Sequence, residues 1–291
     1  MKKFLKNIIG FILTILILFV SILLTTNFIV NNNANFKLDN NITHIIVGNS
    51  HSECSFNDSI ITNCSNLSLS GESYLYTFFK TKKIIELNNI KNITIEFTNI
   101  QIHSTNNEWI WGDEPFSKRF PIFSPFFDFN THVFLLRKNI KQYINGTLLT
   151  LNKNLSKIIL NNYSYKNKIG GFKKLTKQFN FKNYKEKEVE SFLKNNSKTD
   201  ISFTNLHWLK KIIILCENKN INVNLVRSPQ HLKYFLRKNE SDFQLIKKLF
   251  FNEVEFIDLN NFKLNNTDFA DLGHLNFNGS KKTSIHFNNL K

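Results

Sequence analysis

A serine, an aspartate and a histidine occur in settings where they could act together in acyl transfer. Ser50 follows a Gly48-Asn49 pair, and Asp271 and His274 are separated by two residues near the end of the chain. A serine hydroxyl becomes an effective nucleophile when a histidine accepts its proton, and a carboxylate orients that histidine and stabilises its charged form. Ser50, Asp271 and His274 are therefore candidate catalytic residues, provided that the fold unites these distant positions.

The segments around these residues alternate between strand and helix patterns, and this predicts an α/β fold. Strands separated by helices favour a mostly parallel sheet with helices on both faces. Ser50 then follows the first strand at its carboxyl end, where ligand groups gather in such sheets. The predicted strands are 43–47, 65–69, 93–97, 223–226 and 254–257, and the predicted helices begin near 52, run from 74 to about 88, and cover 206–216 and 242–250.

Together, these residues and their order resemble the SGNH (GDSL-like) hydrolase superfamily. Its motifs are a Gly-Asp-Ser turn after the first strand, a glycine, an asparagine and a terminal Asp-x-x-His; Gly48-Asn49-Ser50, Gly71, Asn99 and Asp271-Leu272-Gly273-His274 correspond to them here. The nearest likeness is to membrane-anchored bacterial SGNH-like proteins linked to surface-polysaccharide acylation. Asn49 replaces the usual aspartate, and the residues around Asn99 lack the family's flanking Gly and Asp, so that Asn106 is an alternative to Asn99.

The resemblance implies a three-layer α/β/α, flavodoxin-like fold. It also implies an oxyanion hole made by the backbone N–H groups of Ser50 and Gly71 and the side-chain amide of Asn99, and it implies no metal and no cofactor. A membrane acyltransferase that supplies acyl groups is a partner expected from the family.

Further residues near the predicted strand ends could contact a substrate. His51 adjoins Ser50 and could form a pocket wall, and Arg227, Gln230 and His231 follow the fourth strand. His103, Trp109, Trp111 and the aromatic cluster from Phe116 to Phe129 could form a platform for a sugar ring or an acyl chain, although the core of an insertion is the favoured role for these side chains. The predicted substrate-binding residues are His51, His103, Trp109, Arg227 and His231.

The N-terminal segment predicts a membrane anchor. Lys2, Lys3 and Lys6 precede an uncharged apolar run from Ile8 to Val30, which as a helix would reach roughly 34 Å and so could cross a bilayer. A cleaved signal peptide is the alternative, but its apolar part is usually shorter and ends at a small-x-small site. Lysines before the span predict a cytoplasmic N-terminus and an extracytoplasmic (periplasmic) C-terminal domain in a single-pass plasma (inner) membrane protein.

These observations predict three parts of the chain. Residues 1–30 are a cytoplasmic stub with the transmembrane anchor, residues 31–41 are a linker, and residues 42–291 are the SGNH-like domain. A large helical insertion at about 101–200 interrupts the strand and helix pattern and is expected to cover one end of the sheet.

Charge and cysteine content narrow the partners. The net charge is +16, but only four of the 38 basic residues are arginine and the lysines are scattered, which disfavours a nucleic-acid partner. Of three cysteines, Cys54 and Cys64 could form a disulfide, and Cys216 is expected to be a small buried side chain.

The sequence therefore predicts a serine esterase or O-acyltransferase acting on O-acyl groups of a cell-surface glycan. The partners expected are that glycan, the lipid bilayer and a membrane acyltransferase. The alternative is a non-catalytic glycan-binding or assembly scaffold that retains an SGNH-like fold.

Overall fold

The computed structural model describes residues 1–180, 200–234 and 239–290. The chain divides into two compact units, each made of two separate segments. The helical unit comprises Met1–Asn35 and Phe116–Tyr165, and the α/β unit comprises Phe36–Pro115 and Lys166–Lys291. The chain therefore starts in the helical unit, enters the α/β unit, returns, and then completes the α/β unit.

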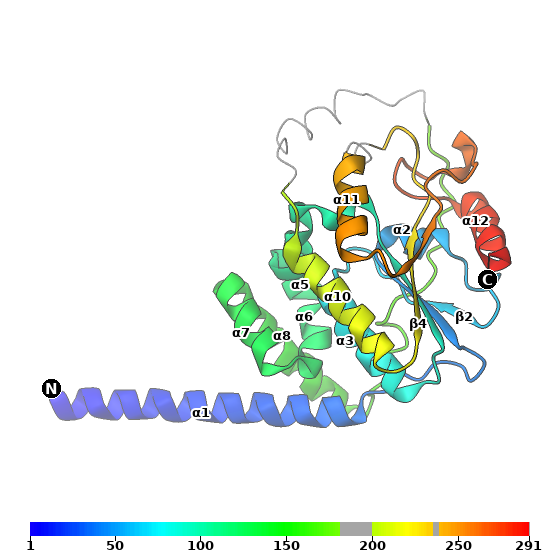
Figure 1. Cartoon of the computed structure of the whole chain (residues 1–291). Helices are drawn as coiled ribbons and strands as arrows, with labels where there is room; N and C mark the ends of the chain where they lie inside the picture. The colour runs from blue at the N-terminus through cyan, green and yellow to red at the C-terminus, as the bar shows by residue number, and fades with distance from the viewer. Residues whose placement is uncertain (181–199, 235–238, 291) are drawn as a thin grey trace. The chain divides into compact units, whose positions relative to one another are not determined.

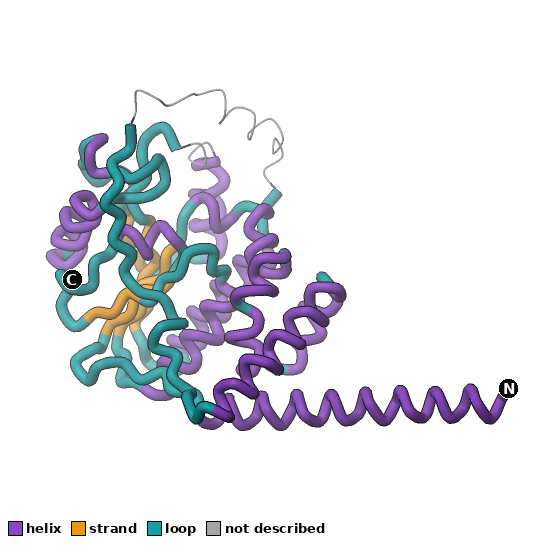
Figure 2. Tube along the Cα trace, turned by 180° about the vertical axis from the view of Figure 1, so that it is seen from behind, coloured by secondary structure: helices purple, strands orange, loops and turns teal. Residues whose placement is uncertain are grey.

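Five parallel strands form the sheet of the α/β unit (Figure 2, orange). Their order in the sheet is β2-β1-β3-β4-β5, so the chain moves from β1 outward to β2 and then returns to the other side of β1. In such a sheet, the crevice between the carboxyl ends of β1 and β3 is where ligands bind. The strands are β1 (His44–Val47), β2 (Cys64–Asn66), β3 (Asn92–Glu96), β4 (Asn222–Arg227) and β5 (Glu255–Asp258).

Helices cover both faces of this sheet. Ile46 of β1 and Val226 of β4 pack in one cluster with Phe287, which belongs to α12 (Phe277–Asn289), a neighbour of α2 (Ser50–Ser55). Because side chains alternate along a strand, Ile45 and Leu225 face the other side, where α3 (Tyr74–Leu87) and α10 (Phe203–Glu217) pack side by side (Figure 1). Burial on both faces explains why β1 is apolar along most of its length.

Shorter elements connect these layers. Phe243 of α11 (Glu240–Phe250) packs against Phe97, directly after β3. The segment after β3 forms η1 (Asn99–Ile102), η2 (Ser104–Asn107) and α4 (Glu108–Trp111), and η6 (Asn266–Asp268) precedes the Asp271 loop. The chain passes from the α/β unit into the helical unit within α5 (Asp113–Lys118).

The helical unit is built around α1 (Lys2–Asn33) and α8 (Ile140–Ile159). Among the described residues, α1 is the helix that is long and apolar enough to cross a membrane. Asn35 continues the unit by exchanging backbone hydrogen bonds with Tyr163 (2.9 Å) and Tyr165 (3.0 Å). The remaining elements are α6 (Phe120–Phe123), η3 (Ser124–Phe126) and α7 (Phe129–Lys138).

The predicted α/β pattern is confirmed, with differences at the ends of elements. Each predicted strand and helix is present, although β2 ends at Asn66. Beyond it, the Leu67 N–H still donates to the carbonyl of Ile46 in β1 (2.8 Å), and the Leu69 N–H donates to the carbonyl of Gly48 (3.0 Å). The predicted linker is helical as far as Asn33, since α1 continues beyond the apolar run.

The division of the chain also differs from the expected one. Residues 101–115 and 166–180 belong to the α/β unit, and only 116–165 lie in the helical unit, together with α1. Part of the predicted insertion, 181–199, lies outside the described residues.

The suggested disulfide is not formed. No bond joins Cys54 and Cys64, because Cys64 packs into the apolar cluster with Ile46 and Phe56 whereas Cys54 lies in α2. Burial raises the pKa of the Cys54 thiol to about 12, with the neighbouring Glu53 adding to the effect, so Cys54 stays protonated. Cys216 is buried, as expected.

Candidate active site

The turn after β1 positions Ser50 at the carboxyl edge of the sheet. Ser50 is the first residue of α2, and the Asn49 side chain caps this helix by accepting a hydrogen bond from the His51 backbone N–H (2.9 Å). Gly48 approaches β3 so closely that a Cβ at this position would lie 2.6 Å from a carboxylate oxygen of Glu96. Glycine at position 48 therefore lets the turn pass directly over β3.

Ser50, His274 and Asp271 form a continuous hydrogen-bonded line. Oγ of Ser50 lies 2.8 Å from Nε2 of His274, and Nδ1 of His274 lies 2.9 Å from both carboxylate oxygens of Asp271. Because Asp271 accepts the Nδ1 proton, Nε2 presents its lone pair to Ser50, which is the tautomer a general base requires. The fold thus brings these three positions together.

This line of residues is open to solvent. Ser50 is half-buried, and the side chains of His274 and Asp271 are 27% and 50% exposed. A molecule arriving from solution could therefore reach the Ser50 hydroxyl.

Hydrogen bonds from backbone N–H groups to the Asp271 side chain hold the loop that carries Asp271 and His274. Oδ1 of Asp271 accepts hydrogen bonds from the backbone N–H groups of Gly273 (2.8 Å) and His274 (2.9 Å). Partial burial alone would raise the pKa of Asp271, but the hydrogen bond and charge of His274, together with these N–H groups, lower it below its ordinary value. Asp271 is therefore an anion at neutral pH, already oriented toward His274.

His51 supports the loop rather than lining a pocket. It is buried, and its ring stacks on that of His274 with centroids 4.9 Å apart and an angle of 14° between the planes. Its Nδ1 donates to the carbonyl of Gly273 (2.7 Å). Burial, with the neighbouring His274, lowers the pKa of His51 to about 4, so the ring is neutral and holds one tautomer.

Glu96 is the residue of the site that sequence reasoning missed. One oxygen of this buried side chain accepts hydrogen bonds from the backbone N–H groups of Asn49 (2.9 Å) and Ser52 (3.2 Å) and from the Ser52 hydroxyl (2.7 Å). Burial raises the pKa of Glu96 to about 7, although these hydrogen bonds oppose the shift. The sequence held one signal, a charged residue inside an otherwise apolar strand pattern.

Gly71 and Trp109 lie together. Gly71 has φ +68°, and a Cβ there would lie 2.4 Å from the Trp109 ring. Glycine is thus required both by the left-handed backbone and by the ring packed against it. Trp109 contacts one of the expected oxyanion residues, which is compatible with its predicted position near a substrate.

The Asn99 side chain has partners other than an oxyanion. Asn99 is fully buried; its amide nitrogen donates to Glu240 (3.0 Å), and its oxygen accepts from Arg227 (3.2 Å). The alternative, Asn106, donates its amide to the carbonyl of Ile100. The amide groups of both residues therefore donate hydrogen bonds within the protein, whereas the resemblance predicts that one of them donates to the oxyanion.

Arg227 is predicted to contact a substrate, but its guanidinium instead forms ion pairs within the protein. Its guanidinium is 2% exposed and forms ion pairs with Glu240 (2.7 Å) and Asp258 (2.5 Å). The cation thereby joins the carboxyl ends of β4 and β5 to α11. The two carboxylates compensate the charge of Arg227, as a buried cation requires.

His103 and His231 are largely buried as well. The His103 ring bonds to the hydroxyl of Thr105 (3.0 Å). The His231 ring bonds to Asn266 (3.0 Å), and its backbone N–H donates to the carbonyl of Leu272 (3.0 Å). His231 therefore attaches the segment after β4 to the loop of Asp271 and His274, and Gln230 is buried beside His51.

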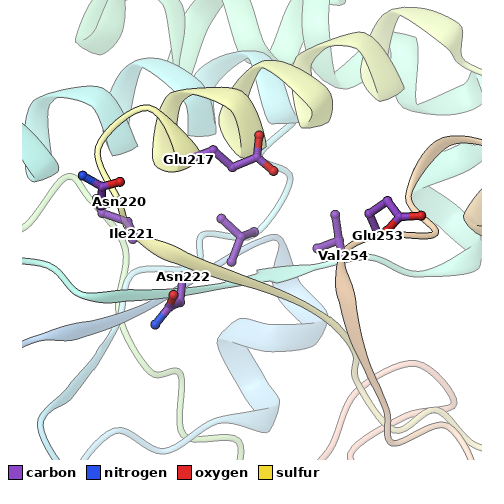
Figure 3. Close-up of a pocket in the computed structure, with 7 residues that line it drawn as sticks. Glu217, Asn220, Ile221, Asn222, Glu253 and Val254 are labelled. Atoms are coloured by element: carbon purple, nitrogen blue, oxygen red, sulfur yellow. The ribbon is translucent and has the colours of Figure 1, made fainter.

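Within residues 1–180, 200–234 and 239–290, no group of three or more His, Cys, Asp and Glu side chains is arranged to hold a metal ion. A shallow pocket (Figure 3) lies at the amino ends of β4 and β5, the edge of the sheet opposite to Ser50. It is lined by Glu217, Asn220, Ile221, Asn222, Val223, Glu253 and Val254.

Comparison with known proteins gives one partial match. The model of an uncharacterised family matches residues 149–290, which include Asp271 and His274 but not Ser50. No curated protein matches the chain.

Proposed function

We propose that the α/β unit is an SGNH-like serine esterase or O-acyltransferase that acts on O-acyl groups, such as acetyl, of a cell-surface polysaccharide. The observation that carries the proposal is the hydrogen-bonded line from Asp271 through His274 to Ser50. Ser50, distant in sequence from Asp271 and His274, adopts with them the order, tautomer and spacing of a nucleophilic triad. These residues lie at the carboxyl edge of a parallel sheet, near β1 and β3.

The reaction follows from these roles. Oγ of Ser50 attacks the ester carbonyl while Nε2 of His274 accepts the hydroxyl proton. The ester C–O bond then breaks, and His274 returns the proton to the departing sugar oxygen, which leaves the acyl group on Ser50. Water, for an esterase, or a second sugar hydroxyl, for a transferase, then attacks the acyl-serine carbonyl while His274 accepts its proton. The bond between the acyl carbon and Oγ of Ser50 breaks, and His274 returns the proton to Oγ, which restores Ser50.

Backbone groups would stabilise the oxyanion in this scheme. The N–H groups of Ser50 and Gly71 are the proposed donors, since the amide groups of Asn99 and Asn106 are already bonded elsewhere. One such donor is typically worth about 10²- to 10³-fold in rate.

The anchor helix gives this chemistry a location. With α1 in the plasma membrane and the lysines of its first turns in the cytoplasm, the α/β unit would face the cell-surface glycan. A membrane acyltransferase is the proposed partner when the reaction is a transfer.

A non-catalytic glycan-binding scaffold is the second candidate. The observation that favours it is the engagement of Asn99 with Arg227 and Glu240, which leaves the oxyanion site without the family's side-chain donor.

Covalent labelling separates the two candidates. A fluorophosphonate probe should label the full-length protein in detergent, and Ser50→Ala should abolish the label because the probe reacts with an activated serine hydroxyl. Ser55→Ala, in the same helix, is the matched control and should label like the parent. An unlabelled parent that hydrolyses no acetyl ester would leave the scaffold as the function.

A further inference from the structure

We propose that α8 is a membrane-surface helix, whose outward apolar stripe enters the extracytoplasmic interface of the bilayer beside the α1 span. This inference concerns the helical unit alone and rests on the membrane anchoring proposed above. It does not depend on the serine chemistry.

The α8 helix has its apolar side chains outside. Five of them recur at spacings of four or seven residues, so they share one helical face, and each is between 40% and 78% exposed. The buried positions of the same helix are a glycine, two threonines and an asparagine (Gly146, Thr147, Thr150 and Asn154). This is the reverse of a helix on a water-soluble protein. The outward apolar stripe comprises Ile140, Ile144, Leu148, Leu155 and Ile159.

The inward face of α8 is fitted to its neighbours, so the stripe cannot simply rotate into the core. A Cβ at Gly146 would lie 2.8 Å from the Phe120 ring of α6. Thr150 forms a hydrogen bond to the Ser124 hydroxyl of η3 (2.9 Å). Turning the helix to bury Leu148 would break these contacts and force larger side chains into the space that Gly146 allows.

The stripe continues an apolar surface that is already proposed to face lipid. Asn154 of α8 donates to Asn27 of α1 (2.7 Å), and Val30 of α1 is buried. The contact between the two helices therefore lies near the extracytoplasmic end of α1 (Figure 1). The apolar side chains of α1 before this contact are exposed; lipid chains around them would also reach the adjoining stripe.

The charge of this region fits an anionic membrane surface. No aspartate or glutamate occurs from Phe129 to Lys185, whereas Arg137, Lys138, Lys141, Lys153 and Lys157 fall within α7 and α8. Lysines and arginines beside an apolar face are attracted to anionic headgroups. A bilayer thus satisfies both the exposed apolar stripe and the basic charge.

Depth-dependent quenching of tryptophan tests the proposal. Full-length protein carrying Leu148→Trp would be reconstituted in vesicles of phosphatidylcholine and phosphatidylglycerol, with and without brominated phosphatidylcholine. Lys153→Trp, at an exposed position about 140° around α8 from Leu148, is the matched control, and Leu16→Trp reports the α1 span. The parent, with its three tryptophans, supplies the background to subtract.

We expect bromolipid to quench Leu148→Trp nearly as strongly as Leu16→Trp, with emission at shorter wavelength than in Lys153→Trp. Quenching of Leu16→Trp without quenching of Leu148→Trp would overturn the inference and leave the anchor intact. Emission from Leu148→Trp that is unquenched but shifts with protein density in the vesicle would instead assign the stripe to a second copy of the chain. Absence of quenching at both positions would refute the anchor and this inference together, while the fluorophosphonate result at Ser50 would be unaffected.

Discussion

At the residue scale, the reactivity of Ser50 depends on side chains that surround its turn and its base. Asp271 fixes the tautomer of His274. His51 supports the same loop, because its ring stacks on that of His274 and its Nδ1 donates to the carbonyl of Gly273. Glu96 holds the backbone on both sides of Ser50. The proposed nucleophile and its proposed base are therefore each supported by a buried titratable group.

Single and double substitutions of the triad should have nearly equal effects. Ser50→Ala and His274→Ala should each lower the turnover of a small acetyl ester by roughly 10³-fold or more, and the double variant should be little worse, because the residues act as one unit. Asp271→Asn should be somewhat less damaging, since an amide oxygen can still accept the N–H groups of Gly273 and His274. Steady-state kinetics measure this; full activity of Ser50→Ala would end the enzymatic proposal.

Glu96→Gln should change how stability depends on pH. The folded-state pKa of Glu96, about 7, lies above the ordinary value of 4.5, so the parent loses stability as pH rises between these values, by up to about 3 kcal/mol. Glutamine does not ionise and can keep the carbonyl acceptor for Asn49 and Ser52. The variant should therefore gain in stability relative to the parent from pH 5 to pH 7.

The readout is the difference in Tm between variant and parent, measured in detergent across this pH range. His51, whose folded pKa is about 4, contributes the opposite slope, because its stabilising effect is lost as pH falls. That contribution is common to both proteins and cancels in the difference. A constant difference in Tm from pH 5 to pH 7 would show that Glu96 does not titrate there.

At the element scale, the sheet was predictable and several polar contacts were not. The β-branched runs and helical spacings specify β1, β3, β4 and the helices between them, because burial on both faces leaves a strong apolar pattern. Ser50, Asp271 and His274 could be found because their position after strands is itself a sequence feature. The partner of Asn99 depends on Arg227 and Glu240 meeting across three elements, and no local pattern encodes such a meeting.

Gly71 shows how one element is fitted to another. Gly71→Ala should destabilise the α/β unit, since a left-handed alanine costs about 1–2 kcal/mol and its Cβ would also overlap the Trp109 ring. Trp109→Ala in the same chain should relieve the overlap but not the backbone strain. Thermal unfolding measures both effects.

Gly171→Ala is the matched control for this series, because a Cβ there would meet nothing within 4 Å. It should leave Tm near that of the parent. Equal stability of Gly71→Ala and the parent would mean that the turn can shift away from Trp109.

At the scale of the whole molecule, the proposed orientation makes a direct prediction. A reporter that is active only outside the cytoplasm, such as a periplasmic phosphatase, should be active when fused after Lys291 and inactive when fused before Lys2. The lysines that precede the apolar part of α1 are the reason. The reverse pattern of phosphatase activity in intact cells would overturn the localisation.

The interleaving of the two units bears on whether this protein can be shed from the cell. The chain after α1 is hydrogen-bonded to Tyr163 and Tyr165, and α1 itself bonds to Asn154. A protease that cut the chain just before Phe36 would therefore not release the remainder, because residues 116–165 would still hold α1 as a non-covalent partner. The order of synthesis matters for the same reason. The helix α1 is synthesised first, but the helical unit cannot be complete until residues 116–165 have also been synthesised. The N-terminal helix is thus part of a folded body as well as the proposed membrane anchor, and detachment from that anchor would require the body to come apart.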